Sequence, residues 1–369
     1  MVEKLNLGVC GLGGMGVVCA RAFKMSPKAH VVAVADVVED TARKYADELK
    51  ATAYSEYQEM LERDKLDAVC ITTPQHLHAE QSIAAMNRGL HVFCTKPMAV
   101  TLEEADSMIE AAKKNKVKLE ISFHYRFDKR IMKMKEIIDK GEIGRPFSTV
   151  TSIQSYRGAE YWASSPWRAS LSQAGGGALT LNYSHDIDFL QWYFGPVEWV
   201  FGKVDTMVHN VEVEDVATAV IRFKKGVMST FTCSTAARGS KAPRLEIFGT
   251  EGTISLLTRE SRDPKVPYPA AVPAVYTKGR WTTLSIRDSP ESVRRWKGKI
   301  MPWTVPLKGL SSIESLVAHI DEFLTCVLED REPTVPGEEG KRVIETIQAI
   351  YMSSRHGKIV ELPLTARAM

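Results

Sequence analysis

Three segments carry residue types that could do chemistry. Lys96 precedes a proline and directly follows an apolar run, which predicts a lysine held at the end of a strand. A glycine-rich loop spans Gly11–Gly16, and a turn at Gly175–Gly177 precedes His185. Open parallel sheets bind their ligands at the carboxyl ends of the strands. In this order the segments predict an enzyme that transfers hydride to or from a nicotinamide cofactor.

The glycine-rich loop matches the dinucleotide-binding pattern G-x-G-x-x-G. It follows a predicted strand and opens a predicted helix. Glycines permit the tight turn and a close approach of the backbone to the pyrophosphate, and the helix N-terminus supplies N–H donors. We therefore predict that the loop binds the cofactor through Gly11, Gly13, Gly14, Met15 and Gly16.

Asp36 bears on the choice of dinucleotide. It ends the second predicted strand, and Val37 and Val38 follow it rather than Arg or Ser. A carboxylate there accepts hydrogen bonds from the adenosine ribose hydroxyls and repels a 2′-phosphate. We predict NAD rather than NADP; the alternative is that Asp36 only caps the following helix.

A polar segment stiffened by proline follows another strand. Thr73, Pro74 and His78 belong to it and are predicted to lie beside the cofactor. His76 and His78 stand two residues apart, but at the start of a helix they would face different ways. No metal site is predicted.

His185 lies in a segment, residues 178–193, that reads as one long helix. One face of that helix presents Leu181, Ser184, His185, Asp188 and Phe189. Imidazole titrates near neutrality, so His185 is a candidate general acid/base for a hydroxyl proton. The alternative is a structural histidine in the core.

Composition sets the limits of the chain. With 369 residues it has room for two domains, and its formal charge of +3 gives no general case for nucleic-acid or membrane binding. Residues 258–308 hold eleven Lys/Arg against four Asp/Glu. This stretch favours a solvated, irregular excursion over a site for an anion. The six cysteines have no C-x-x-C spacing, which indicates the reducing cytoplasm.

The predicted elements change character near residue 122. Before it, short apolar runs alternate with helical patterns, which favours a parallel, doubly wound α/β sheet. Thr101 and Glu104 predict a capping box on one of its helices. After it, the chain is rich in predicted strands and closes with helices at 313–328 and 338–355. We therefore divide the chain into domains at 1–122 and 123–369.

Together these motifs resemble the Gfo/Idh/MocA family of sugar and cyclitol oxidoreductases. The resemblance runs through the glycine loop and Thr73–His78, and it includes Thr95-Lys96-Pro97 in the place of the family's Glu-Lys-Pro. It continues in the following segments, listed in order: Gly141–Gly144, Trp167-Arg168, Gly175–Gly177, His185 with Asp188, and the helix at 344–357. It implies a Rossmann NAD-binding domain and a C-terminal α/β domain with a large, mostly antiparallel sheet.

The resemblance also implies roles for individual residues. Lys96 would contact both the nicotinamide ribose and the substrate hydroxyl, where an ammonium stabilises developing alkoxide charge. It further places these residues at the cofactor: Thr95, Trp167 and Arg168. The resemblance also implies that a second set of residues contacts the substrate: His124, Arg126, Arg157, Trp162, Asn182 and His185. For Tyr156 and Tyr161 a packed interdomain loop is the alternative.

The chain departs from the family at two positions. Many members carry a carboxylate three or four residues before the histidine, where this chain has Asn182 and Leu181. Thr95 replaces a glutamate. An amide cannot serve as a base, so Lys96 and His185 must do more, or Tyr183 or Asp186 compensates.

The prediction is an NAD-dependent oxidoreductase acting on a secondary alcohol of a sugar, an inositol or a sugar derivative. Two alternatives are a transient-redox glycosidase or epimerase with tightly bound NAD, and a non-catalytic NAD-binding regulator. The partners expected are a small-molecule substrate and a second copy of the chain, as a homodimer or homotetramer. A cytoplasmic location is expected.

Overall fold

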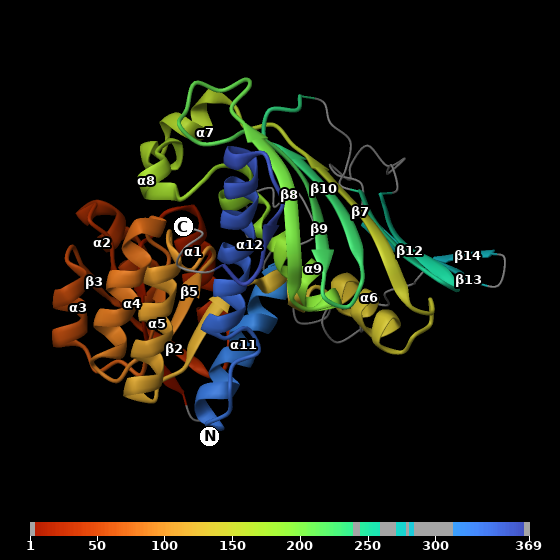
Figure 1. Cartoon of the computed structure of the whole chain (residues 1–369). Helices are drawn as coiled ribbons and strands as arrows, with labels where there is room; N and C mark the ends of the chain where they lie inside the picture. Colours follow the sequence, from red (N-terminus) through yellow and green to blue (C-terminus); the bar gives the residue numbers. More distant parts are fainter. Residues whose placement is uncertain (1–3, 239–243, 259–270, 278–279, 284–312, 365–369) are drawn as a thin grey trace, which may run out of the picture.

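The first part of the chain forms a parallel six-stranded sheet covered by helices on both faces (Figure 1). The computed structural model describes residues 4–238, 244–258, 271–277, 280–283 and 313–364. The strands are β1 (Leu5–Cys10), β2 (Ala29–Ala35), β3 (Thr52–Tyr54), β4 (Ala68–Ile71), β5 (His91–Thr95) and β6 (Leu119–Ser122). Their order, β3-β2-β1-β4-β5-β6, reverses between β1 and β4, which is the edge where such sheets bind ligands.

Five helices connect these strands. They are α1 (Gly14–Met25), α2 (Glu39–Leu49), α3 (Tyr57–Arg63), α4 (His78–Met86) and α5 (Leu102–Asn115), with a 3₁₀ turn η1 (Gln75–Leu77) before α4. The predicted capping box is confirmed at α5. The Thr101 hydroxyl accepts from the Glu104 amide, and the Glu104 carboxylate accepts from the Thr101 amide, each at 3.1 Å. Satisfying these free amides fixes where α5 begins, just beyond the Lys96 segment.

The second part forms a nine-stranded sheet in the order β14-β13-β12-β11-β7-β10-β9-β8-β15. Its strands are β7 (Pro146–Gln154), β8 (Val197–Asp205), β9 (Val216–Phe223), β10 (Met228–Ser234), β11 (Arg244–Gly249), β12 (Gly252–Thr258), β13 (Ala271–Thr277), β14 (Arg280–Thr283) and β15 (Val360–Glu361). Neighbouring strands are antiparallel except for β7 and β10, which are parallel. The prediction of a mostly antiparallel second sheet is confirmed.

The expected irregular excursion at 258–308 is wrong where the structure describes it. Residues 271–277 and 280–283 are β13 and β14, which pair antiparallel at one edge of the large sheet. Strand β13 pairs with β12, and β14 pairs with β13. Residues 259–270, 278–279 and 284–312 lie outside the described residues.

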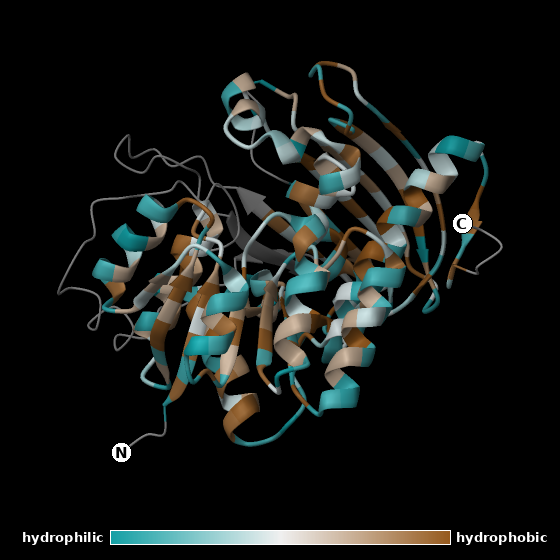
Figure 2. Ribbon diagram, turned by 90° about the vertical axis from the view of Figure 1, so that its left-hand side faces the viewer, coloured by the Kyte–Doolittle hydropathy of each residue, from teal (hydrophilic) through white to brown (hydrophobic). Residues whose placement is uncertain are grey.

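The remaining helices lie between the sheets or around the large one. They are α6 (Lys129–Asp139), α7 (Ala159–Ala163), α8 (Leu171–Ala174), α9 (Ser184–Phe194), α11 (Ile313–Leu328) and α12 (Gly337–His356), with 3₁₀ turns η2 (His124–Phe127) and η3 (Pro166–Ala169) and a π-turn η4 (Ala178–Asn182). Their outward faces are polar, whereas the strands of the first sheet are strongly hydrophobic (Figure 2). Among the described residues, no helix has the length and apolarity to cross a membrane.

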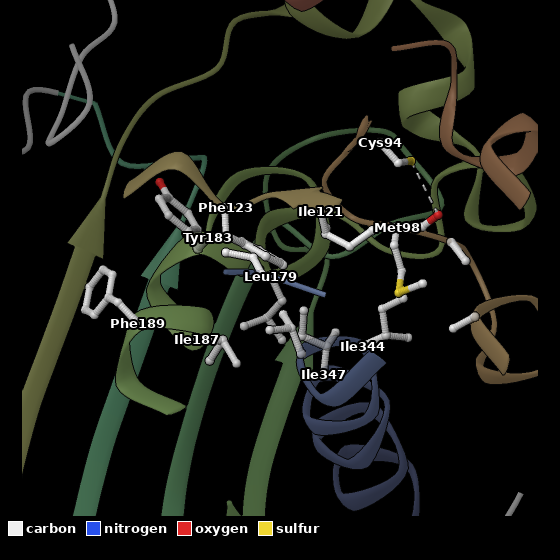
Figure 3. Close-up of a cluster of buried hydrophobic side chains, with 14 of the residues drawn as sticks. Cys94, Met98, Ile121, Phe123, Leu179, Tyr183, Ile187, Phe189, Ile344 and Ile347 are labelled. Atoms are coloured by element: carbon white, nitrogen blue, oxygen red, sulfur yellow. Dashed lines mark hydrogen bonds between the residues drawn. The ribbon is translucent and has the colours of Figure 1, made fainter. Parts of the chain in front are cut away.

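Helix α12 joins the two halves through an apolar core. Figure 3 shows Ile344 and Ile347 of α12 beside Leu179 of the π-turn, with Ile121 and Met98 from the first sheet nearby. All five side chains are buried. The close packing fixes the π-turn relative to the strand end that carries Lys96.

Helix α11 covers the first sheet although it comes late in the chain. Its side chains Leu316, Ile320 and Phe323 are buried in one apolar cluster with β1 and α1. Phe323 also packs against Phe93 of β5, with ring centroids 5.5 Å apart. The late helix therefore closes the core of the dinucleotide-binding part.

Candidate active site

The glycine loop leaves its backbone open at the start of α1. Gly11 has φ of +86°, a conformation that favours glycine, and a Cβ on Gly16 would lie 1.9 Å from the Gly11 oxygen. By contrast, nothing lies within 4 Å of the places where Gly13 and Gly14 would carry a Cβ. The open space faces the first amides of α1, beside the exposed Met15. This arrangement fits a pyrophosphate at a helix N-terminus.

Asp36 ties the glycine loop to the end of β2. Its carboxylate accepts from the Leu12 amide at 2.7 Å and from the Val38 amide at 2.9 Å. Helix α2 has Val38 as its N-cap, with no side-chain cap, so Asp36 is not the capping residue. Val37 and Val38 are exposed and offer no cation for a phosphate. The residues present therefore fit NAD.

We expect the charge of Asp36 to set the preference for NAD over NADP. Asp36→Ser removes the repulsion of a 2′-phosphate, so the preference for NADH over NADPH should fall about tenfold, equivalent to about 1.4 kcal/mol. Dissociation constants from fluorescence titration measure the change. Asp36→Asn is the matched control, because it keeps the shape and one acceptor oxygen but loses the charge. A wild-type protein that binds NADPH more tightly than NADH would contradict the assignment.

The contact of His78 with the cofactor stays a prediction, and in the structure both of its ring nitrogens have partners within the protein. The side chain is buried, with Nδ1 2.9 Å from the Pro97 oxygen and Nε2 2.8 Å from the Thr73 oxygen. Both ring nitrogens therefore face main-chain carbonyls of the protein. His78 connects the loop after β4 to the loop after β5, and so helps to position Thr73, Pro74 and Lys96.

Lys96 follows β5, and its ammonium donates to the main-chain oxygen of Leu181 at 2.7 Å. Burial lowers the pKa of Lys96 to about 8, with Asp186 opposing and Arg157 adding to the shift. The neighbouring Thr95 hydroxyl donates to the Ile71 oxygen at 3.1 Å within the sheet. The contact between Thr95 and the cofactor stays a prediction.

The predicted helix at 178–193 is divided in two. The π-turn η4 ends at Asn182, α9 begins at Ser184, and the Tyr183 amide donates to the Ala178 oxygen five residues back. π-turns often occur at functional sites. Because of this break, the Leu181 main-chain carbonyl is free to accept the hydrogen bond from Lys96. Leu181 stands at one of the positions where many family members carry a carboxylate. A neutral oxygen thus takes the place of a charged partner.

Glu214 holds the π-turn, and the sequence analysis missed it. Its buried carboxylate accepts from the amides of Gly177 and Leu179 at 2.7 and 2.8 Å, and from the Tyr351 hydroxyl at 2.9 Å. Burial raises the pKa of Glu214, which these hydrogen bonds oppose. The signal available was an acidic pair, Glu214 with Asp215, at the start of an otherwise apolar strand.

His185 sits in a stack of aromatic rings close to Lys96. Its ring lies parallel to Tyr125 with centroids 4.0 Å apart, and edge-on to His124 at 4.7 Å. Burial lowers the pKa of His185 well below its usual range, and Lys96 adds to this. Burial likewise lowers the pKa of His124 to about 3. Both imidazoles are therefore neutral at pH 7.

Asp186 is the acidic group of this site. It is buried beside His185 in the chain, and burial raises its pKa to about 7, while Lys96 opposes the shift. Tyr183, the other candidate for compensation, donates its hydroxyl to the Ser234 oxygen at 2.9 Å and also meets Ser155. Burial raises the pKa of Tyr183, so its hydroxyl stays neutral. Of these two residues, Asp186 remains as a source of charge.

Five buried polar atoms in this region have no hydrogen-bond partner among the described residues. They are His124 Nδ1, Arg157 Nε, Trp162 Nε1, Asn182 Oδ1 and His185 Nδ1. They come from η2, the end of β7, α7, the π-turn and α9. An unsatisfied buried polar group costs about 1–3 kcal/mol, so such a cluster indicates a place for a polar ligand.

The contact of Arg126 with the substrate stays a prediction, and in the structure its guanidinium is paired with carboxylates. Its guanidinium forms a bidentate ion pair with Asp188 at 2.6 and 2.9 Å and a third contact with Glu339 at 2.9 Å. Arg126 and Asp188 are both buried. These three side chains connect η2, α9 and α12, and the guanidinium uses its hydrogen-bond donors in these contacts.

Trp167 and Arg168 lie in η3, next to the helix α8 that contacts η1 of the first part. The Arg168 guanidinium carbon lies 4.6 Å from the ring centroid of Tyr161 and 5.5 Å from that of Trp167. These residues therefore cover the edge of the first sheet after β4. Their contact with a cofactor stays a prediction.

Two family models match the chain. Residues 5–123 match "Oxidoreductase family, NAD-binding Rossmann fold", and residues 131–255 match "GFO/IDH/MocA C-terminal domain". The first model covers the whole six-stranded sheet, and the second covers β7 to β11 and the start of β12 in the larger sheet.

Named relatives and solved structures agree. The chain is 34% identical to myo-inositol 2-dehydrogenase of Thermotoga maritima over 68% of this chain and 74% of that protein. It is 26% identical to levoglucosan dehydrogenase of Pseudarthrobacter phenanthrenivorans over 98% of this chain and 99% of that protein. A levoglucosan dehydrogenase solved in complex with NADH superimposes with a TM-score of 0.82 at 25% identity, covering 98% of this chain and all of that one. The chain therefore belongs to the Gfo/Idh/MocA family and is an NAD-dependent dehydrogenase.

Proposed function

We propose that this dehydrogenase oxidises a secondary alcohol of a sugar, an inositol or a sugar derivative. The observation that carries the proposal is the cluster of five unsatisfied buried polar atoms around Lys96 and His185. A polyhydroxylated ring offers hydroxyls that both donate and accept, which suits such a mixed set of donors and acceptors. Relatives named for inositol and levoglucosan support the same substrate class.

The cofactor would be held by the amides at the start of α1, by Asp36 and by the loop at Thr73 and Pro74. When bound, NAD supplies the acceptor for the hydride that leaves the alcohol carbon. Lys96 in its neutral form accepts the hydroxyl proton, because its pKa of about 8 lies close to neutrality. The Leu181 carbonyl fixes the position of the Lys96 nitrogen.

His185 holds and orients the same hydroxyl. Its ring is neutral and fixed by Tyr125, so its one ring N–H can donate to the hydroxyl oxygen while Lys96 accepts the hydroxyl proton. After proton transfer Lys96 carries a positive charge, which the nearby Asp186 carboxylate stabilises. Asn182, whose oxygen has no protein partner, is suited to a second hydroxyl of the ring.

We also propose an assembly of two or four chains and a division of the chain at residue 122. Strand β8 exposes Phe201, which is 46% accessible, whereas the next residue, Gly202, lies against Ile350 of α12 on the other face of the sheet. A second copy would cover the Phe201 side chain. Light scattering of the purified protein distinguishes a monomer from a dimer or tetramer.

NADH formation tests the function. The purified protein is supplied with NAD and a panel of sugars, inositols and sugar acids, and NADH absorbance is followed. We expect steady reduction of NAD with one substrate class. A protein that turns over substrates with no net NADH and keeps its cofactor through purification would be a transient-redox enzyme. A protein that binds NAD and turns over nothing would be a regulator, and either result would contradict the proposal.

A further inference from the structure

The ring of one tyrosine in α7 contacts two arginines. The guanidinium carbons of Arg157 and Arg168 lie 5.0 and 4.6 Å from the ring centroid of Tyr161. A third, that of Arg238, lies 4.0 Å from the centroid of the neighbouring Tyr156. A guanidinium that stacks on an aromatic face keeps its N–H edge free for hydrogen bonding.

These three arginines have no carboxylate partner within ion-pair distance in the part of the chain that the structure describes. Other arginines of the protein, such as Arg21 and Arg331, are paired with glutamates. The acidic side chains nearest in the fold are used elsewhere or stand apart. Glu212 accepts from the Leu171 amide, Glu214 holds the π-turn, Asp186 lies beside Lys96, and Glu160 is exposed on α7 and pairs with none of them.

The arginines adjoin the reacting groups. The Asn182 amide donates to the Tyr161 hydroxyl at 3.4 Å, and the preceding residue, Leu181, accepts from Lys96. Arg157 is close enough to Lys96 to help lower the pKa of that ammonium. Two hydrogen bonds fix the Arg157 backbone, from its amide to the Thr235 oxygen at 2.7 Å and between its oxygen and His209 at 2.8 Å. Its Nε is buried without a partner.

We propose that Arg157 and Arg168 form an anion subsite and that the substrate carries a carboxylate or a phosphate. The proposal rests on the proposed function, since it names the class of sugar or cyclitol that the same site takes. Guanidinium edges bind these groups in a bidentate manner, which fixes orientation as well as charge. Nη1 of Arg168 donates to the Tyr161 main-chain oxygen at 3.1 Å and to the Ser164 hydroxyl at 3.4 Å, and its other N–H groups remain available for an anion.

The dinucleotide is not the expected anion at this position. Its pyrophosphate is expected at the open amides of Gly13 and Gly14 on the first sheet, whereas Arg157 follows β7 of the second sheet. Arg168 lies in η3, next to the helix α8 that contacts η1, and it is also predicted to contact the cofactor. Its effect on the anion must therefore be distinguished from its effect on cofactor binding. The affinity for NADH is therefore measured alongside that for the substrate.

Matched pairs of compounds test the subsite: a hexose against its uronate, a hexose against its 6-phosphate, and an inositol against its monophosphate. We expect kcat/KM to be at least about tenfold higher for one anionic member than for its neutral partner. Arg157→Gln should lower kcat/KM for that anion about 30-fold or more, in line with the loss of one partner of a desolvated charge pair, and should lower kcat/KM for the neutral partner much less. The preferred pair identifies carboxylate or phosphate as the group bound.

Two further variants complete the test. Arg168→Gln should weaken binding of the same anion by a larger factor than it weakens binding of NADH. Arg145→Gln, an exposed arginine just before β7, is the matched control and should change nothing. Titration calorimetry of the anion with the NADH-loaded protein gives the affinity for the anion without turnover. A variant that has lost NADH binding is recognised as having a folding defect.

The outcomes separate the two proposals. NADH formed equally from neutral and anionic partners, with Arg157→Gln affecting both alike, keeps the proposed function and overturns the subsite. Weaker NADH binding in Arg168→Gln with unchanged anion affinity also overturns the subsite as a pair. Anion binding that Arg157→Gln abolishes, with no NADH formed from any compound, supports the subsite and contradicts the proposed function.

Discussion

Lys96→Met is expected to lower kcat for alcohol oxidation by more than about 10²-fold, a typical contribution of a general acid or base. Methionine keeps the unbranched shape of the side chain but cannot accept a proton. The Leu181 oxygen then loses its donor, which lies at 2.7 Å. Steady-state rates with saturating NAD and substrate measure the effect. Turnover close to that of the wild type would remove Lys96 from the mechanism.

The pH profile tests the same residue without a mutation. Burial lowers the pKa of Lys96 to about 8, so the neutral amine is scarce below that pH and predominant above it. We expect kcat for oxidation to rise about tenfold per pH unit below 8 and to level off above it. For reduction of the ketone, which needs the ammonium, the rate should instead fall as pH rises through 8.

Lys96→Arg separates a base from a fixed charge. A guanidinium stays protonated at all relevant pH values, so it keeps the charge but cannot accept a proton. We expect it to be as inactive as Lys96→Met. An arginine variant that keeps most of the activity would show that Lys96 acts only through its charge.

His185→Ala is expected to lose more than about 10²-fold in kcat as well. The imidazole orients the reacting hydroxyl, and alanine removes both ring nitrogens. His185→Gln is the matched variant, because its amide offers a hydrogen-bonding group of similar reach and should recover part of the rate. The affinity for NAD should not change, since the glycine loop and Asp36 belong to other elements.

Stability must be followed in the histidine variants. His185 is buried against Tyr125, Phe123 and His124, so truncation leaves a cavity that costs about 2–4 kcal/mol. Thermal melting identifies an assay temperature at which the variant stays folded. A folded His185→Ala protein with near-normal kcat would contradict the proposed role.

Signals that are local in sequence predicted structure well. The glycine pattern between β1 and α1, the Thr101 capping box and the alternation of strands and helices all depend on residues a few positions apart. Each is satisfied within its own turn or strand-to-helix unit. The presence of a parallel sheet could therefore be predicted from the sequence, whereas the order of its strands could not.

The groups that occupy two of the predicted site residues lie far away from them in the chain. His78 is held by Pro97, Arg126 by Asp188 and Glu339, at separations of 19, 62 and 213 residues. The sequence shows what chemistry a histidine or arginine side chain can do. It does not show which distant groups form its hydrogen bonds and ion pairs. The same reason hid Glu214, whose partners at Gly177 and Leu179 lie more than 30 residues earlier.

The break at Asn182 in the helix predicted over 178–193 could not be predicted from the spacing of apolar residues. Apolar spacing through residues 178–193 is compatible with one helix, and the π-turn depends on Glu214 and on the packing of Leu179 against α12. The departure at Leu181 was visible as a missing carboxylate. Its consequence, a main-chain oxygen that serves Lys96, required the backbone.

Helix α11 bears on how a protein of this kind can acquire a new substrate. The chain leaves the first sheet after β6 and returns to it with α11, whose Phe323 packs against Phe93 in the core. A recombination event with a single junction near residue 122 would separate these partners and leave the nucleotide-binding core uncovered. An exchange of the substrate-binding half needs two junctions, one on each side of it. Diversification by small changes in the segment around Tyr161 is the route that this architecture leaves open.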